Sequence, residues 1–336
     1  MSRRYLIARA VTAAAALVVA CGGAIADPLA GKQIRLLIGS SAGGGYDLFA
    51  RTIAQHWPRQ IPGAPVFVPQ NLPGPLSLNI ANNIFNIAPK DGTAIGAVNP
   101  QIASEAILNP DRARFDARKF VWIGSALRET QVMIALAKAP VTRFEHGFDR
   151  ELILGGSGGA TNTFPALTNA ILGTRFKIVS GYPGTREANL AMERGEVQGI
   201  GAITWASVKA TMGDKLRANE IVVVGQYGRD RHPELGNVSH VPSFAKTPDD
   251  QAALRLLFAT QEFGRPFIAA PGTQAEIAAL LRASFMATMK DSAFLADARQ
   301  RGLDIDPMDG DEIQALVEQL YATPAAVVER VRAVFR

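Results

Sequence analysis

Short apolar runs alternate with segments of helical periodicity along almost the whole sequence, and this alternation restricts the possible folds most. Strands are expected at residues 34–39, 65–69, 93–98, 132–137, 152–156, 177–182, 197–202, 221–226 and 266–270. Helices are expected at residues 47–57, 77–87, 100–108, 163–172, 185–194, 204–211, 250–260, 274–290, 292–301 and 310–334. The apolar runs are short and aliphatic, which is typical of parallel strands buried on both faces. The sequence therefore predicts an α/β fold, and 336 residues are enough for two domains.

The first expected strand leads through three consecutive glycines into a helix. The strand is 34–38, the glycines are Gly43, Gly44 and Gly45, and the helix begins near Asp47. Glycines let a ligand approach the backbone, and the first N–H groups of a helix have no partner within it, so such a turn suits an anion. The segment lacks the Lys of a P-loop and the third glycine of a dinucleotide fingerprint. It indicates a small carboxylate site, with a tight turn that binds nothing as the alternative.

A second segment repeats this plan about a hundred residues later. An apolar run at 152–156 leads through Gly155-Gly156-Ser157-Gly158-Gly159 into a helix. Two such turns could face each other across a cleft between two domains, each holding one end of a small ligand. Tyr46 and Tyr182 lie beside glycine-containing turns and are candidates for the wall of this cleft.

The second turn also contains the pattern G-x-S-x-G, which raises a rival hypothesis. Ser157 would be the nucleophile of a secreted serine hydrolase, since a strand, a turn and a helix form its expected context. A triad needs a downstream histidine, and only His232 and His240 qualify, both in a proline-containing connection. The four histidines are scattered and the acidic run at 305–314 lacks the pattern of a calcium loop, so neither a metal nor a cofactor is expected.

Residues 1–26 have the features of a signal peptide. Three arginines precede an apolar stretch, and Ala24-Ile25-Ala26 offers a cleavage site before Asp27. We expect export to the periplasm; a lipoprotein anchored at Cys21 is the alternative. Without those three arginines, 32 basic residues remain beside 30 acidic ones, so no nucleic-acid partner is expected. Cys21 is the only cysteine, which excludes a disulfide scaffold.

Four stretches, in order, resemble segments of one known family. IGSSAGGGYDLFARTIAQ (38–55), VPQNLPGPLSLNIANNIFNIAPKDGTAIGAV (68–98), GGSGGATNTFPALTNAI (155–171) and VSGYPGTREANLAMERGEVQG (179–199) are similar to segments of the Bug receptors. These are the extracytoplasmic solute-binding proteins of tripartite tricarboxylate transporters. The resemblance extends over nearly all of residues 30–335.

The resemblance implies a two-lobed periplasmic-binding-protein fold (type II, Venus flytrap) with two crossovers at a hinge, near 126–133 and 262–267. Lobe 1 would comprise residues 27–128 plus 264–336, and lobe 2 residues 129–263. It also implies a monomeric receptor without catalysis, which captures a small organic acid and delivers it to integral-membrane transporter subunits. An aromatic acid, a dicarboxylate and a tricarboxylate are all compatible with the sequence.

The resemblance also implies the ligand-binding residues. Carried over by position, they are Ser41, Ala42, Gly43, Gly44, Gly45, Tyr46, Asp47, Asn99, Ser157, Gly158, Gly159, Ala160, Thr161, Asn162 and Tyr182. The sequence departs from the family pattern at Ser40-Ser41-Ala42, at Pro75-Leu76 and at Arg186. We interpret Arg186 as a solvated residue in the first turn of a helix, with a guanidinium fork that binds the ligand as the alternative.

Overall fold

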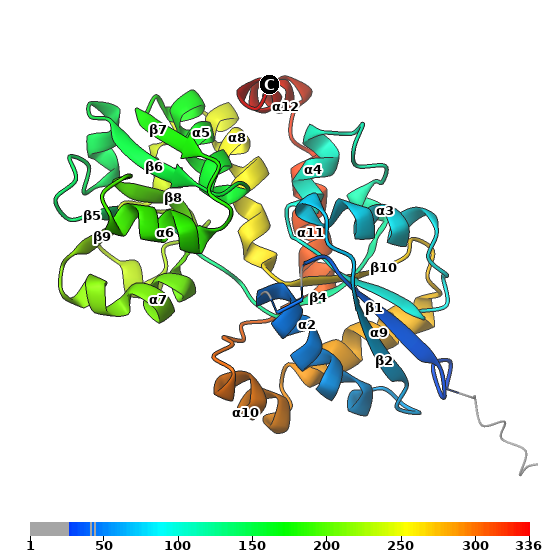
Figure 1. Ribbon diagram of the computed structural model, residues 1–336. Helices are drawn as coiled ribbons and strands as arrows, with labels where there is room; N and C mark the ends of the chain where they lie inside the picture. The colour runs from blue at the N-terminus through cyan, green and yellow to red at the C-terminus, as the bar shows by residue number, and fades with distance from the viewer. Residues whose placement is uncertain (1–26, 41, 44) are drawn as a thin grey trace, which may run out of the picture.

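The computed structural model describes residues 27–336 except 41 and 44, and in it the chain builds two sheets that lie side by side (Figure 1). The first sheet has the order β11-β4-β10-β3-β1-β2, with β1 (Gln33–Ile38), β2 (Val66–Asn71), β3 (Ala94–Ala97), β4 (Val121–Ser125), β10 (Pro266–Ala269) and β11 (Met308–Asp309). The second has the order β7-β6-β8-β5-β9, with β5 (Gln131–Leu136), β6 (Leu152–Gly156), β7 (Phe176–Ser180), β8 (Gly199–Thr204) and β9 (Ile221–Gln226). Each of the expected strands is confirmed, and β4 and β11 were not predicted.

Each sheet combines parallel strands with antiparallel ones. β1 pairs in parallel with β2 and β3, and β6 pairs in parallel with β7 and β8. β10 and β5, which the chain enters after passing from one sheet to the other, run antiparallel to both of their neighbours. The short strand β11 also pairs in antiparallel fashion with β4. The parallel strands thus end together at one edge of each sheet, which is where the glycine turns lie.

Helices cover both sheets. Those of the first lobe are α2 (Gly45–His56), α3 (Leu78–Asn86), α4 (Ile102–Leu108), α9 (Ala275–Thr288), α10 (Ser292–Gln300) and α11 (Gly310–Tyr321). Those of the second lobe are α5 (Ala160–Leu172), α6 (Thr185–Glu193), α7 (Trp205–Arg217) and α8 (Pro248–Phe258). Short 3-10 helices lie at 57–60, 75–77, 117–119, 144–148, 233–235, 241–244 and 259–263. None of the helices in the described ranges is long and apolar enough to cross a membrane.

The C-terminal helix differs from the expectation. One helix was expected over 310–334, but Pro324 divides it into α11 and α12 (Ala325–Val334) because proline cannot continue a helix. α12 packs against α4 of the first lobe and against α5 and α8 of the second (Figure 1). Arg330 forms an ion pair with Asp250 at 2.7 Å, and Arg332 donates to the carbonyl oxygen of Leu108 at 3.0 Å. The helix therefore contacts both lobes.

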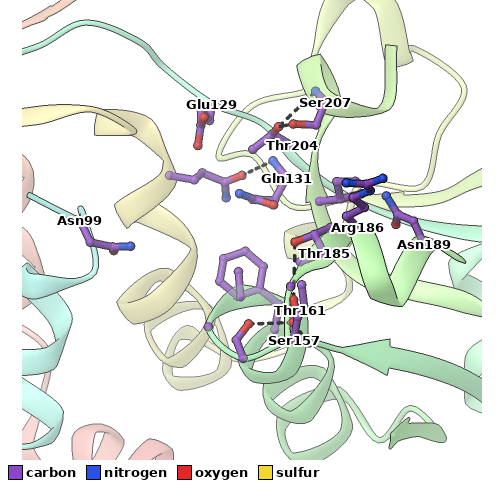
Figure 2. Close-up of a pocket in the computed structure, with 18 of the residues that line it drawn as sticks. Asn99, Glu129, Gln131, Ser157, Thr161, Thr185, Arg186, Asn189, Thr204 and Ser207 are labelled. Carbon is purple, nitrogen blue, oxygen red and sulfur yellow. Dashed lines mark hydrogen bonds between the residues drawn. The ribbon is translucent and has the colours of Figure 1, made fainter. Parts of the chain in front are cut away.

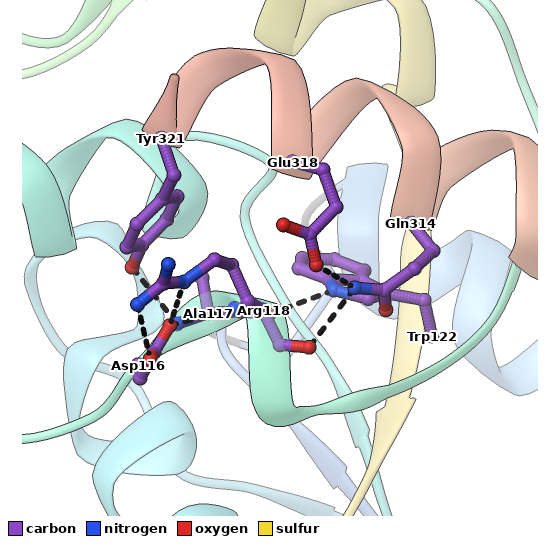
Figure 3. A network of polar contacts seen from close by, with 7 residues as sticks. All are labelled: Asp116, Ala117, Arg118, Trp122, Gln314, Glu318 and Tyr321. Atoms are coloured by element: carbon purple, nitrogen blue, oxygen red, sulfur yellow. Dashed lines mark hydrogen bonds and ion pairs between the residues drawn. The ribbon is translucent and has the colours of Figure 1, made fainter. Parts of the chain in front are cut away.

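Strand β4 is secured by contacts with α11, far along the sequence. Figure 3 shows that Tyr321 accepts a hydrogen bond from the Ala117 N–H at 2.9 Å and that the Arg118 guanidinium lies 4.6 Å from its ring centroid. The indole N–H of Trp122 donates to the carbonyl oxygen of Ala117 at 2.9 Å. Burial raises the pKa of Tyr321 to about 12, so its hydroxyl stays protonated here. The segment before β4 is thus held by Tyr321 of α11, a residue about two hundred positions later in the chain.

The helix after the first glycine turn buries one of its faces. Phe49, Ile53 and Trp57 are buried against the first sheet. Burying a side chain of this size stabilises the fold by roughly 2–3 kcal/mol. The Trp57 indole N–H also donates to the Ser284 hydroxyl at 2.9 Å, so its polar atom is satisfied in the core. This packing fixes the direction in which α2 leaves the turn.

Candidate functional site

A cavity of about 840 Å³ lies between the lobes, where the parallel strands end. The first lobe contributes Tyr46 and Asn99, and the second contributes Ser157 to Thr161. Figure 2 shows Asn99 on one side of this cavity and Arg186 with Asn189 on the other. Tyr46, which follows the first glycine segment, and residues of the second glycine segment therefore line the same cavity.

The first glycine turn (residues 39–47) is held in shape by a buried carboxylate. Asp47 accepts hydrogen bonds from the Gly43 N–H, the Asn71 amide and the Arg51 Nε, each at 2.8 Å. Burial alone would raise the pKa of Asp47, but these three donors outweigh it and lower the pKa below its ordinary value. Asn71 ends β2, directly beside Ile38 at the end of β1. The carboxylate thus ties the turn to the neighbouring strand.

The second glycine turn (residues 155–162) has the same plan with neutral groups. Asn162 accepts from the Gly158 N–H at 2.9 Å and donates to the Ser180 hydroxyl at 2.8 Å. Thr161 accepts from the Ser157 N–H at 2.9 Å. Ser180 ends β7, beside Gly156 of β6. The N-cap of α5 is Gly159, so no side chain of the described chain caps this helix, and the Asn162 and Thr163 N–H groups donate to the Gly159 carbonyl oxygen. Ala160 and Thr161 begin the helix at the cavity, where the first N–H groups of a helix have no partner within it.

The expected binding residues, apart from Ala42, Gly43 and Tyr182, divide into three groups. Those that line the cavity are Tyr46, Asn99, Ser157, Gly158, Gly159, Ala160 and Thr161. Asp47 and Asn162 do not line it, because their side chains face inward and hold the turns. Ser41 and Gly44 lie outside the described residues, and Gly45 begins α2.

Ala42, Gly43 and Tyr182 do not line the cavity, whereas Arg186 does. Ala42 and Gly43 are exposed and do not line the cavity; the N–H of Gly43 is already bound by Asp47. Tyr182 is half-buried and packs against the apolar cluster of the second lobe, so its ring does not form the cavity wall. Arg186, interpreted as a solvated residue, is exposed but does line the cavity.

The Pro75-Leu76 departure places an apolar side chain at the cavity. Leu76 lines it, and both Leu76 (φ 49°) and Ser77 (φ 59°) adopt the left-handed conformation that non-glycine residues rarely take. Ser77 accepts from the Asn99 N–H at 3.0 Å and donates to the Gly39 carbonyl oxygen at 3.3 Å. A Cβ on Gly39 would lie 2.0 Å from the Ser77 hydroxyl, so the close approach requires glycine there. The strained pair thus connects the ends of β1 and β3.

Several lining residues were not predicted. They are Gln101, Glu129, Gln131, Thr185, Asn189, Thr204, Ser207 and Gln261, among others. Thr204 ends β8 and caps α7 by accepting from the Ser207 N–H at 3.2 Å. A search of every position where a strand leads into a helix would have found it. Gln131 begins β5 and Gln261 lies in the 3-10 helix at 259–263, each next to a connection between the lobes, and the Gln261 side chain accepts from the Gln131 N–H at 2.7 Å. No local pattern in the sequence marks these two.

A buried ion pair joins the two connections between the lobes. Arg265 and Glu129 are 2.8 Å apart, with side chains 14% and 8% exposed. The Arg265 guanidinium also lies 4.1 Å from the Tyr46 ring centroid. Burial raises the pKa of Tyr46 to about 12 and raises the pKa of Glu129, although Arg265 opposes both effects. Arg265 thus joins the first glycine turn to the hinge and provides the charge that balances Glu129 beside the cavity.

The geometry does not assemble a serine-hydrolase triad. The nearest side-chain partner of the Ser157 hydroxyl is the Thr185 hydroxyl, at 3.5 Å. His232 accepts from the Glu234 N–H, and the Nε2 atom of His240 lies 2.8 Å from the Gly228 carbonyl oxygen; neither lines the cavity. Within the described ranges no cluster of His, Cys, Asp and Glu could hold a metal ion.

Comparison with solved structures supports the fold. A TctC solute-binding protein from Polaromonas gives a TM-score of 0.68 at 15% identity, over 90% of this chain and 98% of that one. An R. palustris protein solved with adipate gives a TM-score of 0.61 at 21% identity, over 89% of this chain and 97% of that one. The periplasmic binding protein BugD gives a TM-score of 0.58 at 17% identity, over 90% of this chain and 96% of that one. No protein-family model matches the sequence, and no curated protein matches it.

These matches confirm, at the level of the fold, the family resemblance carried by the four sequence stretches. They also confirm the expected α/β architecture with two lobes and two connections between them. The chain therefore has the two-lobed fold of the periplasmic solute-binding proteins of the TctC and Bug type.

Proposed function

We propose that this protein is a periplasmic receptor that binds a small organic carboxylate between its two lobes and performs no catalysis. One observation carries the proposal: Tyr46 of the first strand–glycine–helix turn and Ser157 to Thr161 of the second line one cavity of about 840 Å³ between the lobes. Backbone N–H groups at the start of a helix favour an anion, and the helix dipole adds to this preference. The structural likeness to a protein solved with adipate points to the same class of ligand.

In this proposal the ligand contacts the residues of both turns that line the cavity. Tyr46 and Asn99 would contact it from the first lobe, and Ser157 to Thr161 from the second. Asp47 and Asn162 would act as supports that keep the two turns in the binding conformation. The lobes, divided as residues 27–128 plus 264–336 and residues 129–263, would close about the Glu129–Arg265 pair.

The closed receptor would then deliver its ligand to the membrane subunits of a tripartite tricarboxylate-type transporter. Closure presents a surface that the open form lacks, which is how a membrane partner can distinguish a loaded receptor from an empty one. Export by the signal peptide would place the receptor, as a monomer, in the periplasm.

A thermal-shift screen tests the proposal. The chain from Asp27 to Arg336 would be melted with mono-, di- and tricarboxylic acids and with an aromatic acid, beside the methyl ester of each. A ligand that binds only the folded state at 100 times its Kd stabilises it by about 2.7 kcal/mol, which raises the melting temperature. We expect a rise with at least one acid and none with its ester. If the protein responds to none of the acids and instead hydrolyses an ester in a reaction lost in Ser157→Ala, it is a hydrolase.

A further inference from the structure

Arg186 lies at the cavity because of the way α6 begins. β7 ends at Ser180, and α6 begins at Thr185 after the N-cap Gly184. Arg186 is therefore in the first turn of the helix, where Figure 2 shows it beside Asn189 on the wall opposite Asn99. Its side chain belongs to the second lobe and is part of neither glycine turn, although the hydroxyl of the preceding Thr185 lies 3.5 Å from the Ser157 hydroxyl.

The charges that line the cavity leave Arg186 without a counter-ion. Its acidic lining residues are Glu129 and Glu193, and both already have a basic partner: Glu129 pairs with Arg265 at 2.8 Å, and Glu193 with Lys215 at 2.6 Å. Arg186 is the only Lys or Arg in the described lining, and no carboxylate of the described chain lies within 4.0 Å of its guanidinium. The open cavity therefore carries one uncompensated positive charge.

A second polar group beside Arg186 also lacks a partner. Asn189 follows it by three residues on α6, so the two side chains share a face of the helix. The side-chain oxygen of Asn189 is buried and has no hydrogen-bond partner in the described protein. Buried polar atoms in folded proteins nearly always have partners, and an asparagine amide can turn to present either its oxygen or its NH₂ group. Arg186 and Asn189 thus form a polar patch that faces the cavity.

Closure of the lobes would make this charge costly. In the open cleft water solvates the exposed guanidinium, whereas a closed cavity would remove much of that water. A desolvated charge is tolerated only when it is paired and hydrogen-bonded. A guanidinium suits a carboxylate particularly well because it can donate two parallel N–H···O bonds.

We infer that Arg186 recognises a second anionic group of the ligand, so that this receptor selects a dianionic organic acid over a monoanion of the same length. The inference rests on the proposed function and goes further, since it assigns the second charge to one residue. In this arrangement the glycine turns hold one carboxylate, and Arg186, assisted by the Asn189 amide, holds the other.

Matched acids and matched variants test the inference by isothermal titration calorimetry. The ligands are adipate and hexanoate, which share a six-carbon chain, and succinate and butyrate, which share four carbons. The variants are Arg186→Gln, Arg186→Lys and the control Arg194→Gln. Arg194 ends the same helix, is exposed and pairs with Glu196 at 2.7 Å, away from the cavity. Circular dichroism and melting temperature would establish that each variant folds.

We expect the wild type to bind at least one diacid about tenfold or more tightly than its monoacid. Arg186→Gln should weaken diacid binding by about 10–100-fold, the range for charge-assisted hydrogen bonds, and change monoacid binding less than about threefold. Arg186→Lys should retain part of the preference, and Arg194→Gln all of it. The diacid preference of the wild type should also shrink at high salt.

Two results would overturn the inference and leave the proposed function intact. One is equal affinity of the wild type for the diacid and monoacid of both pairs. The other is an equal loss of affinity for the diacid and the monoacid in Arg186→Gln, because a residue that binds the second carboxylate should affect only the diacid. If the wild type binds none of the four acids or the others in the thermal-shift panel, the proposed function itself fails.

Discussion

The two glycine turns share one backbone design but differ in the chemistry that holds them. In each, a glycine N–H donates to the side chain four residues later, and that side chain contacts the last residue of the neighbouring parallel strand. In the first turn the acceptor is the Asp47 carboxylate, which contacts Asn71. In the second it is the Asn162 amide, which contacts Ser180.

The difference follows from one further position. Arg51 lies four residues after Asp47 and neutralises it at 2.8 Å, whereas the equivalent position after Asn162 is Ala166. A carboxylate at 162 would have no such partner, and its charge would repel an anionic ligand. Each turn therefore has a hydrogen-bond acceptor at this position, and the acceptor is charged only in the turn where a cation accompanies it.

The largest difference should appear when each acceptor is removed. Asp47→Ala removes a buried acceptor that serves the Gly43 N–H, the Asn71 amide and the Arg51 Nε. Asn71 keeps its bond to the Ser40 carbonyl oxygen and Arg51 keeps its bond to Asn71, so the free energy of unfolding should fall by about 2–3 kcal/mol. Asn162→Ala removes only neutral hydrogen bonds and should cost about 1–2 kcal/mol. Urea unfolding of both variants measures the contrast. Equal losses would mean that the Asp47–Arg51 pair adds nothing beyond neutral hydrogen bonding.

The stability of variants in the two turns should also differ in its dependence on pH, by less than the loss caused by removing each acceptor. The pKa of Asp47 is lowered in the folded state, so its contribution to stability is full above the unfolded value of 3.8 and is lost as the pH falls through the folded value. Asp47→Asn should therefore be less acid-sensitive than the wild type below about pH 4. Asn162→Ala has no such group and should keep the pH dependence of the wild type.

The measurement is the urea midpoint of unfolding at several pH values between about 3 and 7. Other carboxyl groups with lowered pKa values, such as Asp91 and Asp250, are common to all three proteins and give the same background slope. A difference between Asp47→Asn and the wild type that is independent of pH would contradict the assignment of acid sensitivity to the first turn.

Local pattern was enough to predict the turns but not the whole wall of the cavity. The strand, glycines and helix of each turn are consecutive in the sequence, so residues such as Tyr46 and Ser157 were predicted and do line the cavity. Glu129 and Gln261 lie in or next to the two connections between the lobes, and only the tertiary fold brings them to the cavity. The strand β4 was not predicted for the same reason, because its pairing with β10 joins segments more than a hundred residues apart.

Residue type alone also could not distinguish the residues that hold the turns in shape from those that line the cavity. Asp47 and Asn162 are polar, adjacent to glycines and placed at helix starts, which are the features expected of ligand-binding residues. Their side chains turn inward because the N–H groups four residues earlier and the ends of the neighbouring strands need partners. The identity of those partners depends on the register of β1 with β2 and of β6 with β7.

The smallest expected effects concern the backbone that the two turns share. Gly43 (φ 79°) and Gly158 (φ 89°) both adopt the left-handed conformation, and a Cβ on either would meet no described atom within 4 Å. Alanine at either position should therefore cost only the conformational strain, about 1 kcal/mol in each turn. Gly173 provides a matched control, because it has φ 84° and equally open surroundings but ends α5 away from the cavity.

All three alanine variants should thus lose similar stability in urea, while only Gly43→Ala and Gly158→Ala should weaken carboxylate binding. Each of these two glycines donates its N–H to the side chain that holds its turn, so a shift in its backbone angles displaces the groups that face the ligand. If Gly173→Ala weakens binding as much as the other two, the loss reflects stability alone. If only one of the two turn variants weakens binding, that turn alone holds the carboxylate.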